Sequence, residues 1–205
     1  YFQAYYIESD LSKRDTLYLK GSKSALKAFE NSDFYKSFSD TSSLENNKKK
    51  LEAIKKAPIE TIGVLFWWAT NHGKYLINKP IIERIESREI LELAMYRIST
   101  LDEDYYYGGP SRFFGMFYSR LPGVPLERAR INFDESLLDN PNYFGTRVLR
   151  ARYYHTKLGN REQFQEDLKH VIETDPSLLP DAMPENLFEQ EKAKELLNNQ
   201  TILFE

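Results

Sequence analysis

One apolar pattern occurs three times along the chain, at intervals of 39 and 35 residues. In each copy three apolar residues stand four positions apart, and an aspartate or proline follows after another four. Residues four apart lie on the same face of an α-helix. One helix pair cannot bury such a face alone, so the pattern indicates a protein built from stacked helical repeats. The copies are Ile90, Ala94, Ile98 and Asp102; Ala129, Phe133, Leu137 and Pro141; and Phe164, Leu168, Ile172 and Pro176.

A second predicted helix precedes each of the last two copies. Gly115 and Tyr118 on the first of these helices align with Ala151 and Tyr154 on the second, at an interval of 36 residues. The small residue allows a partner helix to approach closely, and the aromatic residue follows within one turn. Units of two helices at this spacing resemble the tetratricopeptide repeat, whose period is about 34 residues.

Proline and glycine divide the chain into helical segments. No Asn-Gly or Asp-Gly pair separates alternating apolar runs, so no strand hairpin is expected. We predict an all-α fold of stacked antiparallel helix pairs, a degenerate tetratricopeptide-like α-solenoid, as a single domain over residues 4–205. Tyr1, Phe2 and Gln3 match the end of a common protease-cleavage tag, and we expect them to be a tag remnant. The main predicted helices are Ile59–Tyr75, Arg88–Leu101, Pro110–Leu121, Pro125–Asp139, Thr146–Leu158, Arg161–Thr174 and Glu185–Asn199.

Composition narrows the classes of function. The formal net charge is -3 and basic residues are scattered, which argues against a nucleic-acid partner. The one basic run, Lys48 to Lys50, lies between Glu45 and Glu52 and is interpreted as a solvated helix face. The chain has no cysteine, so disulfides and cysteine-ligated zinc are excluded. No apolar run reaches the roughly 18 residues that a membrane-spanning helix needs.

No motif for catalysis or metal binding is present. His72, His155 and His170 lie on different predicted helices and lack metal-ligand spacing. No Gly-x-Ser-x-Gly elbow occurs. We therefore expect no enzymatic activity, no metal and no cofactor.

Three stretches of the sequence resemble a known family. The first is LFWWATNHGK, residues 65–74, and the second is YYGGPSRFFG, residues 106–115, with LPG at 121–123. The third combines ARINF at 129–133, NPNY at 140–143 and ARYY at 151–154. Together they are similar to the TatT family, the T component of tetratricopeptide-repeat-associated TRAP transporters. The similarity extends from Leu17 to Leu197.

This resemblance implies properties that composition does not show. Such proteins are helical and periplasmic, are often lipid-anchored and can form trimers. They associate with the periplasmic substrate-binding P component of the transporter, and hydrophobic or organic-acid ligands are suspected. A lipid-attachment cysteine would lie upstream of the first residue of this sequence.

Ten residues are candidates for ligand binding. Each has a structural alternative: the aromatic rings can pack in a core, Asn71 can make a structural hydrogen bond, and the glycine can serve a turn. Arg112 can be held by a carboxylate or bind an acidic ligand group, and the other two arginines can be surface ion pairs of little energetic value. The candidates are Trp67, Trp68, Asn71, Tyr106, Gly109, Arg112, Tyr118, Arg147, Arg150 and Tyr154.

Two binding functions remain open from the sequence. A relay for a small molecule needs an enclosed apolar cavity, of about 300–1,000 Å³, or a channel. A protein-interaction scaffold needs an exposed groove for a partner. The last predicted helix, Glu185–Asn199, can either cap the helical stack or contact a neighbouring subunit.

Overall fold

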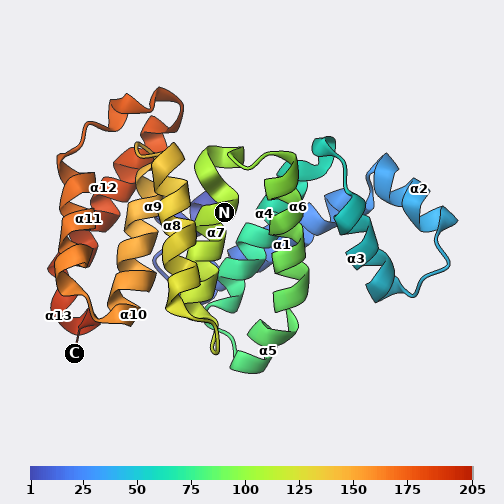
Figure 1. Ribbon diagram of the computed structural model, residues 1–205, viewed down its shortest axis with the longest axis horizontal. Helices are drawn as coiled ribbons and strands as arrows, with labels where there is room; N and C mark the ends of the chain where they lie inside the picture. The colour runs from blue at the N-terminus through green and yellow to red at the C-terminus, as the bar shows by residue number, and fades with distance from the viewer. Residues whose placement is uncertain (205) are drawn as a thin grey trace. The chain divides into compact units, whose positions relative to one another are not determined.

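The structure is a computed structural model that describes residues 1–204, apart from the side chain of Asn47. The chain packs as two compact units, Tyr1–Glu103 and Asp104–Glu205. The chain is 82% helix, and no strand occurs among the described residues. The all-α class is therefore confirmed, whereas the regular solenoid and the single domain stay predictions. Figure 1 shows the course of the helices.

Unit 1 is built around the helix pair α1 and α4. Helix α4 buries Leu65, Trp68 and Ala69, and α6 packs against both α4 and α3. Within this unit α2 and α3 stand together at one end (Figure 1). Its elements are η1 (Gln3–Ile7), α1 (Leu11–Glu30), α2 (Asp33–Thr41), α3 (Asn46–Lys56), η2 (Ile59–Thr61), α4 (Ile62–Leu76), α5 (Ile81–Glu86) and α6 (Arg88–Leu101).

Unit 2 begins with the tightly packed pair α7 and α8. Helices α7, α8 and α9 lie side by side, and α11 and α12 lie beyond α9 (Figure 1). Its elements are α7 (Tyr105–Arg120), α8 (Leu126–Asp139), α9 (Phe144–Leu149), the π-helix η3 (Arg150–His155), α10 (Thr156–Leu158), α11 (Arg161–Glu173), the 3₁₀ turns η4 (Pro176–Leu178) and η5 (Pro180–Ala182), α12 (Met183–Asn198) and α13 (Gln200–Leu203).

The apolar positions that define the sequence repeat face the interior. Ala94, Phe133 and Leu168 are fully buried. The repeat positions Phe164 and Leu168 belong to an apolar core formed by the chain from α9 to α12. This core consists of Phe144, Val148, Ala151, Phe164, Leu168, Val171 and Ala193. The repeat pattern thus correctly identified the buried face of the helices.

Helix α12 joins this core through a polar contact. The Asn186 side chain is fully buried, and its Oδ1 accepts a hydrogen bond from the backbone N–H of Phe144 at 3.0 Å. Its Nδ2 donates to the carbonyl of Asn142 at 2.9 Å. Asn186 therefore satisfies an N–H group at the start of α9 that has no partner within that helix.

Most predicted helices are confirmed within two residues, with three differences. Helices α5 and α13 and the π-helix η1 were not predicted, because elements of four to six residues are too short for a clear periodicity. The predicted helix Thr146–Leu158 begins at Phe144 and contains a π-helical segment. The helix predicted from Pro110 is preceded by a left-handed turn. Gly159 ends α10 with a φ of 74°, as expected for a glycine after a helix.

Gly115 sets the distance between α7 and α8. A Cβ atom at this position would lie 2.7 Å from the ring of Phe133. We predict that Gly115→Leu lowers the free energy of unfolding by about 1–3 kcal/mol, because the added side chain overpacks the pair. Urea denaturation measures the change. Lys169→Leu, at an exposed helical position in the same unit, is the control, and equal stabilities of the two variants would contradict the prediction.

Candidate functional site

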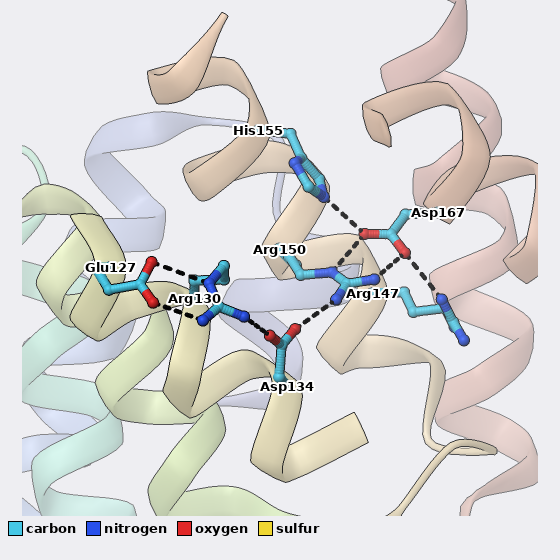
Figure 2. A network of polar contacts seen from close by, with 7 residues as sticks. All are labelled: Glu127, Arg130, Asp134, Arg147, Arg150, His155 and Asp167. Carbon is cyan, nitrogen blue, oxygen red and sulfur yellow. Dashed lines mark hydrogen bonds and ion pairs between the residues drawn. The ribbon is translucent and has the colours of Figure 1, made fainter. Parts of the chain in front are cut away.

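A series of alternating charges links three helical segments of unit 2 (Figure 2). The arginines in the series are joined to the carboxylates by hydrogen bonds and ion pairs, and the ring of His155 lies beside one of these carboxylates. Helix α8, the α9–η3 segment and α11 contribute Glu127, Arg130, Asp134, Arg147, Arg150, His155 and Asp167. We call these seven residues the charge network.

The Asp167 carboxylate is the buried centre of the charge network, with a side chain that is 3% exposed. Arg150 donates from Nε to Oδ2 at 2.7 Å and from Nη2 to Oδ1 at 2.6 Å. Arg147 donates from Nη1 to Oδ1 at 2.9 Å, and His155 Nε2 lies 3.2 Å from Oδ2. A buried carboxylate is tolerated when it is paired and hydrogen-bonded, and here Arg147 and Arg150 fulfil that condition.

These contacts lower the pKa of Asp167. Burial opposes the charged form, but the hydrogen bonds and the charge of Arg150, together with the nearby ring of His155, outweigh it. The pKa therefore falls from 3.8 to about 2. Asp167 is charged at neutral pH and holds α11 against η3.

The π-helix explains how two residues five positions apart reach the same carboxylate. In an α-helix, Arg150 and His155 would point about 140° apart. In a π-helix the hydrogen bonds join residues i and i+5, which places those residues on one face. The backbone N–H of Thr156 bonds to the carbonyl of Ala151 in this way. The π-helix thus turns both Arg150 and His155 toward the carboxylate of Asp167.

The outer end of the charge network is more exposed. Arg130 pairs with Glu127 and Asp134 on its own helix, and these three side chains are 41–59% exposed. Asp134 then accepts from Arg150 Nη1 at 3.0 Å. The network therefore runs from the surface of α8 to the buried carboxylate of α11.

Sequence analysis gave surface ion pairs as the alternative to ligand binding for Arg147 and Arg150, and both do form ion pairs, but with a buried carboxylate instead of at the surface. Their side chains are only 22% and 17% exposed, and both are bonded to buried Asp167. The buried Nε of Arg147 has no hydrogen-bond partner within the described residues. Ligand binding by either arginine stays a prediction.

A left-handed turn forms a second polar group in unit 2. Tyr106, Tyr107 and Gly108 have φ values of 54°, 59° and 66°. A residue with a side chain pays about 1–2 kcal/mol for this conformation. A Cβ at Gly108 would lie 2.9 Å from Ser136 Oγ, so this position requires glycine for space as well as for φ.

Arg112 holds the turn in place. It donates from Nη1 to the carbonyl of Tyr107 at 2.7 Å and from Nη2 to that of Tyr106 at 3.0 Å. Its guanidinium also lies 4.3 Å from the ring centroid of Tyr143, which stacks on Tyr107 at 5.1 Å. The partners of Arg112 are thus main-chain carbonyls and an aromatic ring, rather than the carboxylate that we considered.

The turn also contacts α12. The hydroxyl of Tyr106 donates to Glu185 Oε1 at 2.7 Å. Burial raises the pKa of Tyr106, and the nearby Tyr143 and Glu185 raise it further. Gly109, which follows the turn, is buried.

Tyr118 and Tyr154 lie in the interior of unit 2. They are 1% and 7% exposed. Arg128 lies 4.3 Å from the ring centroid of Tyr118, and its Nη2 donates to the hydroxyl at 3.0 Å. Both rings therefore pack between helices of this unit, and their ligand role stays a prediction.

The remaining candidates belong to α4 in unit 1. Trp68 is in the core, whereas Trp67 is half-buried and contacts the rings of Tyr1 and Phe2. Asn71 is 3% exposed and donates from Nδ2 to the carbonyl of Trp67 at 2.7 Å. Its Oδ1 has no partner in the part of the chain that is described. The ten candidates thus divide among the charge network, the left-handed turn, the unit 2 interior and α4.

Several members of these groups were not among the predicted site residues, and for one of them, Asp167, the sequence contains an indication of its role. Asp167 stands directly before Leu168 and three positions after Phe164, on the buried face of α11. An acidic residue on an apolar helix face requires a cationic partner. No such signal marks His155 or Tyr143. Among residues 1–204 no three acidic or histidine side chains gather in a way that could hold a metal ion.

Comparison with protein families decides the family. The model of the TRAP transporter T-component (TAtT) matches residues 7–204. The chain belongs to this family. The match includes every residue of the charge network and of the left-handed turn. Searched against curated proteins, the T-component chain matches none.

Family membership confirms the resemblance that the sequence motifs indicated. A T-component is an accessory of a transport system and its family is not a known enzyme family. The chemistry of the charge network agrees with a structural task, since its arginines bind carboxylates within the chain.

Loss of the central carboxylate should destabilise unit 2. We predict that Asp167→Asn lowers the free energy of unfolding by about 3–5 kcal/mol, because it leaves Arg147 without a carboxylate and Arg150 with only the more exposed Asp134. Urea denaturation at neutral pH measures this. Glu127→Gln removes an exposed partner at the outer end and should cost less than about 1 kcal/mol. Equal effects of the two substitutions would contradict a buried centre.

The lowered pKa of Asp167 also predicts a pH dependence. Because the folded pKa lies below the unfolded value, the stabilisation is complete above about pH 4 and is lost as the pH falls toward 2. The contribution is roughly 2 kcal/mol. Urea midpoints between pH 5 and pH 2.5 should fall less steeply for Asp167→Asn than for the wild type. Asp139→Asn, which removes an exposed carboxylate, should keep the wild-type slope.

Proposed function

We propose that this protein is a non-enzymatic accessory component of a TRAP-type transport system that binds the substrate-binding P component. The observation that carries the proposal is the family match over residues 7–204, which spans both units. Stacked helices offer long exposed faces for a protein partner, and the charge network keeps the faces of unit 2 in a fixed arrangement.

The proposed location is the periplasm, where a P component would be met. No helix among residues 1–204 is long and apolar enough to cross a bilayer. A lipid anchor upstream of this sequence and a trimeric assembly belong to the proposal through the family resemblance.

A relay of a small hydrophobic or organic-acid ligand is the second part of the proposal. Its support is the family resemblance. The alternative is a scaffold that binds protein partners without a small molecule. The buried state of Trp68, Tyr118 and Tyr154 favours this alternative, because these rings are occupied by packing.

Native mass spectrometry tests the function. The protein is purified from its own cell envelope and measured alone and with the purified P component encoded beside it. We expect a complex of the two proteins, and a small additional mass would favour the relay over the scaffold. A protein that does not bind the P component would contradict the proposed function.

A further inference from the structure

Helix α12 buries polar side chains and exposes apolar ones. The side chains that it buries include Asn186 and Glu189, which are 0% and 1% exposed. Met183 and Leu187, one turn apart, are 39% and 45% exposed. A helix that packs on a core normally turns its apolar face inward. In unit 2 this helix instead presents apolar side chains outward.

The burial of Asn186 has a structural explanation, but the exposure of Met183 and Leu187 has none within unit 2. Asn186 is buried because it caps the start of α9. Met183 and Leu187 make no comparable contribution to the buried core of unit 2. Leu178, in the η4 turn just before α12, is 56% exposed. Helices at the end of a stack need a polar outer face for solubility unless a partner covers them.

The same part of the chain is acidic. Residues 171–190 contain five acidic residues and no lysine or arginine. Glu173, Asp175 and Asp181 are exposed and Glu185 is half-buried. Among the described residues, no ion pair with a lysine or arginine involves these four carboxylates. The negative charge of this stretch is therefore not neutralised by ion pairs within the described chain.

The charge also affects the neighbouring turn. Burial raises the pKa of Tyr107, and the carboxylates of Asp181 and Glu185 raise it further. Asp181 and Glu185 therefore lie close enough to the left-handed turn to act on Tyr107. We call the exposed apolar residues Leu178, Met183 and Leu187, together with the exposed carboxylates Glu173, Asp175 and Asp181 of the same stretch of chain, the α12 face.

We propose that the α12 face is the docking surface for the P component and that it binds a basic segment carrying an apolar side chain. The inference rests on the proposed function for the identity of the partner. The exposed leucines and Met183 would bury the apolar side chain, while the carboxylates bind lysine or arginine around it.

Charge complementarity excludes other classes of partner. Anionic lipid headgroups and nucleic-acid phosphates would be repelled by an acidic surface. A second copy of this chain is the remaining alternative, because its α3 helix holds five lysines and one glutamate. The experiment therefore has to separate the P component from self-association.

Two substitutions test the α12 face by biolayer interferometry with the purified P component. Leu187→Ser should raise Kd about tenfold or more, mainly through faster dissociation. Asp181→Lys should lower the association rate constant about three- to tenfold at low salt, with the difference disappearing at high salt. Both residues are exposed or half-exposed, so the fold should be retained, which circular dichroism checks.

Two matched variants serve as controls. Leu158→Ser removes an exposed leucine at the end of α10, and Glu195→Lys makes the same charge change near the end of α12. Both should bind the P component like the wild type. Sedimentation velocity of each variant alone records self-association.

Each outcome decides between defined alternatives. Weaker binding by the two α12 variants alone supports the docking surface. Equal binding by all variants overturns the α12 face but leaves the proposed function intact, whereas no binding by the wild type overturns both. Loss of self-association with unchanged binding of the P component overturns the proposal in favour of a second copy.

Discussion

Burial of one carboxylate governs the arrangement of unit 2. Asp167 lies on the inner face of α11 among apolar residues, where an unpaired charge would be prohibitively costly. It accepts hydrogen bonds from Arg147 and Arg150, and His155 Nε2 lies 3.2 Å from it, so that α11 is joined to the α9–η3 segment. Arg150 extends the connection to Asp134 on α8. Three helical segments are thus positioned by a polar interaction, within a core that is otherwise apolar.

The same principle recurs at the left-handed turn and at α12. Arg112 bonds two carbonyls of a strained backbone segment, and Asn186 bonds the start of α9. In each case a long or branched polar side chain from one element satisfies main-chain groups of another. Such contacts are directional, so they fix the relative position of elements more narrowly than apolar packing does. A docking surface benefits from this rigidity, because less conformational freedom is lost on binding.

Buried helix faces could be predicted from the spacing of residues in the sequence. Contacts that depend on unusual backbone conformation or on the packing of distant helices could not. Ala129, Phe133 and Leu168 identified buried helix faces, and Gly115 identified a close helix contact. The partner of Arg112 could not be predicted, because Tyr106 and Tyr107 adopt a conformation that non-glycine residues rarely take. Asp167 and its partners are up to 20 residues apart, and only the packing of α11 on α9 and η3 brings them together.

The π-helix has a consequence for comparing this chain with its relatives. A π-helical turn is an α-helix that holds one additional residue, and the helix on either side keeps its register. A relative with one residue fewer between Leu149 and Thr156 could form a continuous α-helix while the buried faces of α9 and α10 stay in place. The partners of Asp167 would then stand four positions apart, one α-helical turn, and could still reach it. A single-residue gap in a family alignment at this point therefore marks a change of helix type and not a loss of the fold.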